Sequence, residues 1–304
     1  MLFSIHKPQM TAKIIDGKQI AADLKIQIAS QIEQIKKDHN VTPTLAVILV
    51  GADAASQIYV GNKEKAAHLV GMNSILYKFA SNISEADLLK KIIDLNEDKN
   101  VHGILVQLPL PKHIDPTKVI KTISYKKDVD GFNMINVGKL SVGEIDGDDS
   151  AMIPCTPLGS IHLLKSALGD DLSGLKTLVV GTSNIVGRPL ARLLMLEKCT
   201  VTIASSSTRD LKAECLVADV ILTATGVANL IKGDMVKKGA CVIDIGINRI
   251  DLGNGKTKLV GDVEFDSVKD VAGFITPVPG GVGPMTIAYL LQNTLSCFLK
   301  TKNK

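Results

Sequence analysis

Two kinds of hydrophobic pattern alternate along the chain. The stretches Thr44–Val50 (TLAVILV) and Gly103–Pro111 (GILVQLPLP) open as uninterrupted apolar runs, whereas Lys18–Lys37 carries isoleucine and leucine every three or four positions. Continuous apolar runs are typical of strands buried on both faces, and the wider spacing is typical of the helices that cover them. The alternation therefore predicts βαβ units and a mostly parallel sheet.

The first half of the chain continues this pattern. A helix is expected around Tyr59 and Lys63 with Asp53 as its N-cap, then a strand over Ser74–Phe79 and a helix from the capping residue Ser84 to Asn96. Asp128–Gly147 is rich in Gly and Asp and shows little periodicity. We interpret this stretch as loop and linker.

A second alternating series begins at Leu175. It contains a strand at TLVVG, a helix over Arg188–Leu196 and further strands at CTVTIA, DVILTA and ACVIDIG. Met285–Leu299 is a final helix with an apolar face. The predicted fold class is thus α/β, with two three-layer domains over residues 1–150 and 151–283 and a C-terminal helix, 284–304, packing back onto the first.

Composition narrows the possible partners. The chain has 304 residues, 45% of them hydrophobic and 22% charged, which suits two globular domains and excludes a disordered chain. The net charge of +4 is spread out, so nucleic-acid binding is unsupported. No apolar run approaches the ~18 residues of a membrane span, and the first ten residues lack the apolar core of a leader.

Cysteine and histidine usage bears on location and metals. The five cysteines form no C-x-x-C pair, which favours a reducing compartment over a disulfide framework, and we expect a cytoplasmic protein. The six histidines are scattered and none has a ligand-like partner. No metal site is therefore predicted.

Candidate chemistry begins on the helix that carries Tyr59 and Lys63. Ser56, Tyr59 and Lys63 share one helix face, where a ring and an amine can hold a flat ligand beside a proton carrier; an ordinary surface helix is the alternative. Gln107 emerges at the carboxyl end of a strand, where open α/β sheets bind ligands and where it can hydrogen-bond a lysine. Asp130 in DVDGF can accept two N–H bonds from a heterocycle, or can simply form the turn.

The second series carries dinucleotide signals. LVVGTSNIVGRPLARLL resembles the first βα turn of a nucleotide-binding domain, although Ser183 stands where a second glycine is usual and a purely structural turn remains open. The following strand ends in hydroxyl residues, Ala204–Arg209, without a carboxylate, which favours NADP over NAD; a polar turn is the alternative. Thr276–Thr286 packs three prolines and three glycines, as a ligand-approaching loop or a rigid connector does.

Taken together, these motifs resemble those of the bifunctional methylenetetrahydrofolate dehydrogenase/methenyltetrahydrofolate cyclohydrolase family. The resemblance runs from Ala12 to Leu299 and rests on YVGNKEK, VQLPLP, KDVDGF, PCTPLG, VVGTSNIVGRP, TATG, VIDIGIN, VGDVEF and ITPVPGGVGPMT. It implies an N-terminal folate-binding catalytic domain, a Rossmann-like NADP-binding domain, a cleft between them and a homodimer formed through the dinucleotide domains. It also implies tetrahydrofolate derivatives as substrates, in one-carbon metabolism and purine biosynthesis.

The resemblance assigns roles residue by residue. Lys63 is the catalytic lysine, Tyr59 stacks on the folate, Gln107 supports the lysine and Asp130 anchors the pterin. Thr182 departs from the several members that carry Arg there against the 2′-phosphate, and Ser205 replaces a His seen in relatives. The implied substrate-binding residues are Tyr59, Val60, Gly61, Asn62, Lys63, Val106, Gln107, Leu108, Asp130, Pro279, Gly280, Gly281, Val282 and Gly283, and the implied NADP contacts are Gly181, Thr182, Ser183, Ser206 and Ile247.

The implied reaction is oxidation of 5,10-methylenetetrahydrofolate to a methenyl cation and its hydrolysis to 10-formyltetrahydrofolate. An ammonium beside that cation would be repelled, so a neutral amine is favoured at Lys63, where it can accept a proton from water. Three other functions remain open: a dinucleotide-dependent dehydrogenase of another substrate class, a folate- or dinucleotide-binding regulatory protein without turnover, and a member that keeps only one activity.

Overall fold

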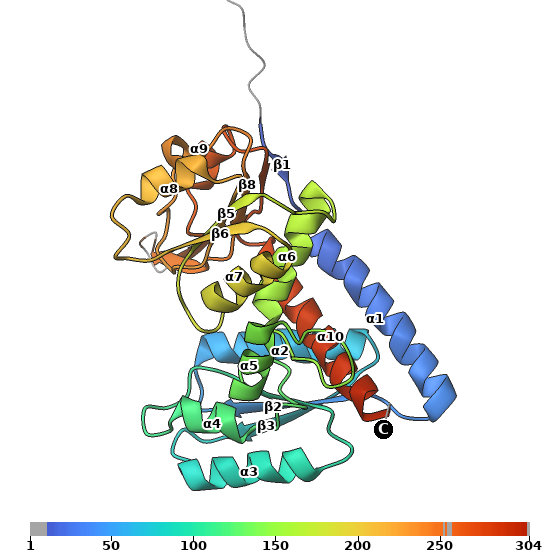
Figure 1. The fold of residues 1–304 in the computed structure, drawn as a ribbon. Helices are drawn as coiled ribbons and strands as arrows, with labels where there is room; N and C mark the ends of the chain where they lie inside the picture. Colours follow the sequence, from blue (N-terminus) through green and yellow to red (C-terminus); the bar gives the residue numbers. More distant parts are fainter. Residues whose placement is uncertain (1–10, 252, 254–256, 303–304) are drawn as a thin grey trace, which may run out of the picture. The chain divides into compact units, whose positions relative to one another are not determined.

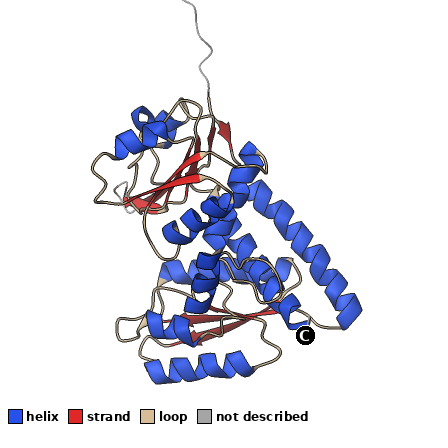
Figure 2. Ribbon diagram, in the orientation of Figure 1, coloured by secondary structure: helices blue, strands red, loops and turns tan. Residues whose placement is uncertain are grey.

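The computed structural model describes residues 11–251, 253 and 257–302, which form two compact units (Figures 1 and 2). Among the described residues, the first unit combines residues 11–20 with Thr156–Met285, and the second combines Ala21–Cys155 with residues 286–302. In both, helices cover a parallel sheet, which confirms the predicted α/β class. The first ten residues, to which the prediction about a leader refers, lie outside the described residues.

The second unit is built on a parallel sheet with the strand order β3-β2-β4. Val47 of β2 pairs with Leu76 of β3 and Leu105 of β4. All of β2 is buried, which explains its continuous apolar sequence. The elements are α1 (Gly17–His39), β2 (Thr44–Val50), α2 (Ala54–Leu69), β3 (Asn73–Phe79), α3 (Glu85–Glu97), β4 (Gly103–Val106), α4 (Pro116–Thr122), α5 (Met134–Val142) and α10 (Val282–Lys302).

Helices cover both faces of this sheet. Leu88, Ile92 and Leu95 of α3 form one core with Ala46 and Ile48 of β2, and Figure 1 shows α2 and α10 on the opposite face. The two predicted N-caps are confirmed by their hydrogen bonds, because Asp53 accepts from the backbone of residue 56 and Ser84 accepts from that of residue 87. These caps fix where α2 and α3 begin.

The interpretation of Asp128–Gly147 as loop and linker is wrong in its middle. Residues 134–142 form α5, which begins after the cap Asn133 and ends at Gly143 with φ 90°. The Asn133 side chain accepts the backbone N–H of Ile135, and a left-handed glycine closes the other end. A nine-residue helix offers too few turns for its apolar period to stand out.

The first unit contains a six-stranded sheet with the order β1-β11-β8-β7-β5-β6, in which all neighbouring strands run parallel. A separate antiparallel pair, β9 and β10, lies outside this sheet. The elements are β1 (Lys13–Ile14), α6 (Cys155–Leu168), β5 (Lys176–Val180), α7 (Gly187–Leu196), β6 (Thr200–Ala204), α8 (Leu211–Val217), β7 (Val220–Thr223), η1 (Gly233–Met235), β8 (Cys241–Asp244), β9 (Asn248–Asp251), β10 (Thr257–Val260), α9 (Phe265–Val268) and β11 (Phe274–Ile275).

This sheet is also the middle of three layers. Cys215 of α8 and Val268 of α9 share one core with Leu178, Ile221 and Val242 of the strands. Helix α7 packs against β5 and β6, and Figure 1 shows it on the face away from α8 and α9. The predicted three-layer arrangement therefore holds within each unit.

The N-terminal strand β1 does not belong to the unit in which the predicted domain boundaries, residues 150 and 283, would place it. Ile14 pairs with Ile275, and the backbone N–H of Ile15 donates to the Ile275 carbonyl at 2.9 Å. These hydrogen bonds place residues 11–20 in the first unit, although we assigned them by sequence to the N-terminal domain. The cause is the β1–β11 pairing, which joins segments at opposite ends of the chain.

Candidate active site

A lysine and a glutamine from different elements meet in the second unit. Lys63 lies on α2, and Gln107 follows β4, where its backbone N–H continues the sheet by donating to the Ile48 carbonyl. The Lys63 Nζ donates to Gln107 Oε1 at 3.0 Å, and Gln107 Nε2 donates to the Leu108 carbonyl at 2.6 Å. The amide is held at both ends, so it fixes the position of the amine.

The residues that we predicted on one face of α2 differ in their exposure to solvent. Ser56 and Val60 are buried, but the Tyr59 ring is 44% exposed one turn before Lys63. The Asn62 side chain is also exposed. Tyr59 therefore offers a ring to a ligand, whereas the Val60 side chain packs in the core.

Asp128, rather than Asp130, forms the turn of the DVDGF motif. Its buried carboxylate accepts the backbone N–H of Gly131 at 3.1 Å, the N–H of Asn133 at 2.7 Å and the Asn136 side chain at 2.9 Å. Asp128 thus fills the turn-forming role that the sequence left open for Asp130.

Asp130 remains available on the same loop. Its carboxylate accepts no hydrogen bond from the described residues. Burial raises its pKa to about 6, and the nearby Lys63 charge opposes that rise. A desolvated carboxylate without donors, close to the Lys63 amine, is a natural acceptor for N–H groups of a ligand.

A side chain from α10, which no sequence motif indicates, hydrogen-bonds to the loop that carries Asp130. Asn293 of α10 donates through Nδ2 to the Val129 carbonyl at 2.8 Å and to the Ile153 carbonyl at 2.9 Å. Gly131 has φ 70°, and a Cβ there would lie 2.5 Å from the Met152 carbonyl oxygen. No local sequence pattern links Asn293 to the loop, because they are 164 residues apart.

In the first unit, the β5–α7 turn requires its glycines. Gly181 has φ 123°, and a Cβ there would lie 2.4 Å from the Ala224 carbonyl oxygen; a Cβ on Gly187 would lie 2.0 Å from the Gly181 oxygen. The Ser183 hydroxyl accepts the N–H groups of Val186 and Gly187 at 3.2 and 3.3 Å. Ser183 thus closes the turn before α7, at the position where the usual motif has glycine, and Thr182 beside it is exposed.

The hydroxyl-bearing residues that follow β6 differ in their contacts: some hydrogen-bond within the turn and others are exposed to solvent. Thr208 Oγ1 accepts the N–H of Ser205 at 2.9 Å, and Ser205 Oγ accepts that of Ser207 at 3.2 Å, so the polar-turn alternative holds for Ser205 and Thr208. Ser206 and Arg209 are exposed, and their side chains bond to no other residue in the described part of the chain. Ser206 and Arg209 are therefore among the free polar groups at the end of β6 in the described part of the chain.

The Pro-Gly loop and Ile247 also lie in the first unit. Gly280 has φ 112°, and a Cβ on Gly281 would lie 2.7 Å from the Pro277 oxygen, so the backbone requires both glycines. Gly283 has open space around it, and Val282 is buried. Ile247 is 48% exposed after β8.

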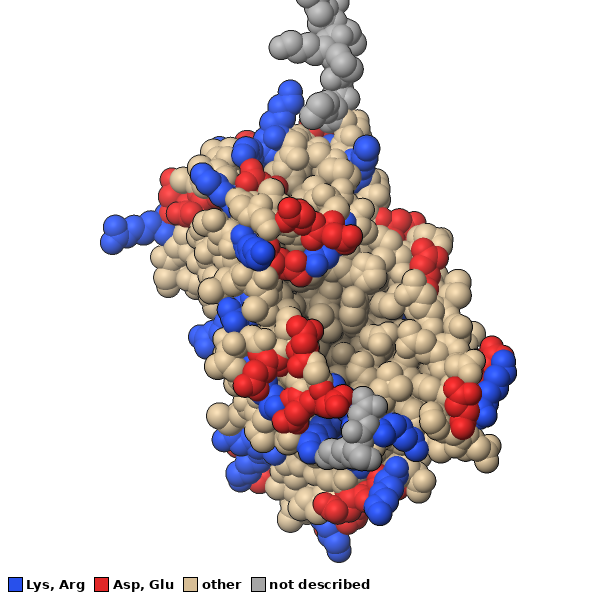
Figure 3. All heavy atoms as spheres, turned by 45° about the vertical axis from the view of Figure 1, so that its right-hand side comes forward, with Lys and Arg blue, Asp and Glu red and all other residues tan. Residues whose placement is uncertain are grey.

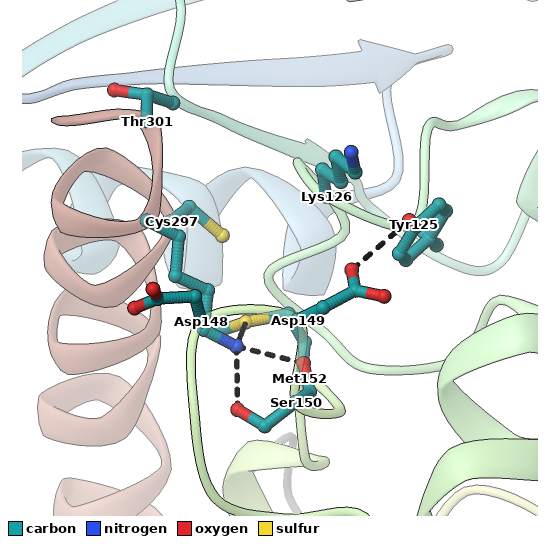
Figure 4. A pocket seen from close by; sticks show the side chains of 9 residues that line it. Tyr125, Lys126, Asp148, Asp149, Ser150, Met152, Cys297 and Thr301 are labelled. Atoms are coloured by element: carbon teal, nitrogen blue, oxygen red, sulfur yellow. Dashed lines mark hydrogen bonds between the residues drawn. The ribbon is translucent and has the colours of Figure 1, made fainter. Parts of the chain in front are cut away.

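A cavity of about 270 Å³ lies apart from all the predicted site residues (Figure 4). Lys300 donates there to the carbonyl and hydroxyl oxygens of Ser150 at 2.7 and 2.8 Å, and the Tyr125 hydroxyl donates to Asp149 at 3.1 Å. These polar groups bond one another, so the cavity gives no reason to move the candidate site.

On the face in Figure 3, basic and acidic side chains are interspersed rather than gathered into one basic patch. Across residues 11–251, 253 and 257–302, no group of three His, Cys, Asp or Glu side chains is arranged to hold a metal ion. In the same residues no helix is long and apolar enough to cross a membrane.

Comparison with known proteins identifies the family of both halves of the chain. Residues 15–130 match the family model of the tetrahydrofolate dehydrogenase/cyclohydrolase catalytic domain, and residues 154–302 match that of its NAD(P)-binding domain. "Bifunctional protein FolD" of Cereibacter sphaeroides is 55% identical over 287 residues, covering 94% of this chain and 95% of the relative. The corresponding protein of Rhodospirillum rubrum is 53% identical over 288 residues, covering 94% and 97%.

Solved structures give the same result. The bifunctional dehydrogenase/cyclohydrolase FolD of Campylobacter jejuni superposes with a TM-score of 0.89 and 45% identity, covering 96% of this chain and 99% of that one. The Trypanosoma brucei enzyme, solved with NADP cofactor and an inhibitor, gives a TM-score of 0.90 and 34% identity, covering 97% and 99%. With both halves matched, this chain belongs to the tetrahydrofolate dehydrogenase/cyclohydrolase family.

Proposed function

We propose that this chain oxidises 5,10-methylenetetrahydrofolate to 5,10-methenyltetrahydrofolate with NADP and hydrolyses that product to 10-formyltetrahydrofolate. The second unit carries the folate chemistry and the first binds the dinucleotide. The observation that supports this most is the Lys63 amine, bonded to Gln107 and close to the hydrogen-bond-free Asp130 carboxylate. The other dehydrogenase classes that the sequence left open need no such set.

Lys63 acts as the proton carrier of the hydrolytic step. The methenyl cation repels an ammonium, so the bound substrate favours the neutral amine. Water adds to the cationic carbon and gives one proton to Nζ. The ammonium then protonates the ring nitrogen as its bond to carbon breaks, and the remaining hydroxyl proton of the adduct passes to solvent as the formyl C=O forms. Gln107 Oε1 holds one N–H of the amine, which directs the nitrogen lone pair. A general base of this kind contributes about 10²–10⁴ to the rate.

Asp130 binds the pterin. Two N–H groups of the heterocycle supply the hydrogen bonds that the protein does not give this carboxylate, and they stabilise its ionised form against the burial that raises its pKa to about 6. The exposed Tyr59 ring stacks on the flat ligand. Roles for Val106, Leu108 and the backbone of Pro279–Gly283 stay predictions from the resemblance.

NADP fits the first unit. The Gly181 turn brings backbone close to a pyrophosphate at the start of α7, and the cofactor supplies the hydride acceptor. Ser206 and Arg209 offer a hydroxyl and an unpaired guanidinium to the 2′-phosphate. Arg209 thereby supplies the positive charge that Thr182 lacks.

The chain assembles as a homodimer through the first unit. β6 is an edge strand, so one row of its backbone groups is unpaired, and Ile203 on it is 48% exposed. Met195, on the neighbouring α7, is 55% exposed. An apolar edge of this kind pairs well with a second copy of itself.

The free cysteines bear on the cellular compartment of the enzyme, and its product bears on the pathway that it supplies. All five cysteines are free, as suits a reducing compartment, and this supports a cytoplasmic enzyme. Its product is an activated one-carbon unit, which suits purine biosynthesis.

A two-step assay tests the function. Methylenetetrahydrofolate and NADP are mixed with the protein, and NADPH formation and the decay of the methenyl species are followed together. Both signals are expected. NADPH formation with no faster methenyl decay than in buffer would mean that only the dehydrogenase remains, and no NADPH would reject the proposal.

A further inference from the structure

Two buried aspartates join the loops at the carboxyl ends of β7 and β8. Asp262 is completely buried, and its Oδ2 accepts the hydroxyl of Thr223 at 3.1 Å and both the N–H and the hydroxyl of Thr225 at 2.6 and 2.9 Å. Its Oδ1 accepts Asn248 Nδ2 at 2.9 Å. One carboxylate therefore ties the turn after β7 to the start of β9, which follows the loop after β8.

Asp244 at the end of β8 holds Asp262 in turn. Asp244 Oδ1 accepts the backbone N–H of Asp262 and of Gly246 at 3.0 Å each. A Cβ on Gly246 would lie 2.1 Å from Asp262 Oδ1, and a Cβ on Gly261 would lie 1.7 Å from Asp244 Oδ2. The Asp262 carboxylate thus packs against Gly246, which follows Asp244 by two residues, and the Asp244 carboxylate packs against Gly261, which precedes Asp262. These close approaches explain why VIDIGIN and VGDVEF both contain a glycine.

The loops tied by Asp262 end in exposed apolar side chains. The Thr225 hydroxyl, while donating to Asp262, accepts the N–H of Val227 at 3.2 Å. Val227 is 51% exposed, and Ile247, beside Asn248, is 48% exposed. A buried network of two carboxyl groups that presents two apolar side chains to solvent costs more free energy than an ordinary turn needs.

The strand order indicates which half of a bound dinucleotide lies near Val227 and Ile247. In a dinucleotide-binding sheet the adenosine ribose lies at the end of the second strand and the pyrophosphate at the first βα turn. Here those places are β6 and the β5–α7 turn, and β7 and β8 continue in the opposite direction from β5. The loops after β7 and β8 therefore lie where the nicotinamide half of the cofactor extends.

We propose that Asp262 is a positioning residue for the dehydrogenase reaction. Through Thr225 and Asn248 it sets the turn with Val227 and the loop with Ile247 in the arrangement that receives the nicotinamide half of NADP. This inference rests on the proposed function for its ligand but assigns a role that the motifs alone do not.

Thr225→Val is the main test, because it keeps the side-chain shape and removes the hydroxyl between Asp262 and Val227. The dissociation constant of NADPH, measured by fluorescence titration, and the KM for NADP are both expected to rise about tenfold. Cyclohydrolase kcat/KM should stay near wild type. Thr225→Ser, which keeps the hydroxyl, should restore both values, and Asp262→Asn should exceed the Thr225→Val effect if it folds.

Thr177→Val is the matched control. The Thr177 hydroxyl is also buried and donates to the Thr200 carbonyl at 3.2 Å, but at the amino end of β5. It should lose a similar amount of thermal stability without weakening NADPH binding. Equal weakening in Thr177→Val, or unchanged NADPH binding in Thr225→Val, would overturn the inference. A wild type that binds NADPH but oxidises no folate would instead reject the proposed function, and the binding comparison would still decide the role of Asp262.

Discussion

The amine of Lys63 donates a 3.0 Å hydrogen bond to the side-chain oxygen of Gln107. The two residues come from α2 and from the end of β4, and β4 pairs directly with the central strand β2. A flexible lysine held in this way loses less freedom when substrate arrives. The contact therefore fixes the amine in place on α2, as the proposed role of proton carrier requires.

Replacing Lys63 tests that position. Lys63→Met removes the base but keeps the length of the side chain, so methenyltetrahydrofolate hydrolysis should fall by about 10²–10⁴ while the protein stays folded. Lys65→Met, at an exposed lysine of the same helix, is the control and should retain full activity. Hydrolysis near the wild-type rate in Lys63→Met, with an unchanged circular dichroism spectrum, would remove Lys63 from the mechanism.

Asp130→Asn separates folate binding from cofactor binding. The amide presents one acceptor where the carboxylate presents two, so the folate dissociation constant should rise at least about tenfold. NADPH binding should not change. Calorimetric titration with each ligand measures both, and an unchanged folate constant would contradict the assignment.

The same substitution predicts a pH-dependent gain in stability. The pKa of Asp130 is about 6 in the folded chain, above its ordinary value, so the stability tied to its neutral form is present below pH ~4 and is lost as pH rises through 6. Asp130→Asn should therefore be more stable than wild type at pH 8, by roughly 1 kcal/mol after allowing for partial exposure, and should lose that gain by pH 4. Thermal unfolding at several pH values checks this.

A helix or strand of this protein can be predicted from the sequence when its burial leaves a clear apolar pattern. β2 was predicted with its observed bounds because burial on both faces leaves an unbroken apolar run. The caps of α2 and α3 follow from side-chain chemistry next to an apolar period. Two-residue strands such as β1 and β11 carry no period, so only the folded chain shows that they pair.

The candidate site shows a similar limit. The motifs indicate Lys63 and Gln107, but DVDGF does not tell which aspartate forms the turn. Burial and three donors give that role to Asp128 and leave Asp130 for a ligand. Asn293 and Asp262 could not be found from spacing, because each acts on residues distant in the chain.

Cofactor preference provides a further prediction. If Arg209 pairs with the 2′-phosphate, Arg209→Ala should raise the KM for NADP by about tenfold and leave that for NAD unchanged, because NAD lacks the phosphate. Initial rates with each cofactor measure the difference. Lys176→Ala, an exposed charge at the amino end of β5, should change neither value. An equal effect on both cofactors would point to a general loss of binding.

The proposed dimer depends on an exposed apolar position. Ile203→Lys places a charge on the open edge of β6 and should convert the protein to a monomer in sedimentation velocity experiments. Thr202→Lys, also exposed on this strand, is the comparison and should weaken the dimer less, because the pleat turns it to the other face. A wild type that sediments as a monomer would contradict the proposal directly.

A buried histidine is expected to weaken the fold as the pH falls. His102 Nδ1 accepts the backbone N–H of Thr44 at 3.1 Å, and its ring meets that of Phe298 edge-on at 4.9 Å. Burial, with the charges of Lys127 and Lys302, lowers its pKa to about 4. Because the folded chain holds the neutral ring, the stability it contributes is present above pH ~6.5 and is lost as pH falls toward 4.

His102→Asn keeps an acceptor for Thr44 but cannot titrate. We expect it to cost about 1–2 kcal/mol at pH 7 through lost packing. Between pH 6.5 and 4.5, however, it should lose less stability than wild type, by up to about 3 kcal/mol. Urea unfolding across this range measures the slope. Parallel curves for the two proteins would show that His102 is not the group whose protonation weakens the second unit.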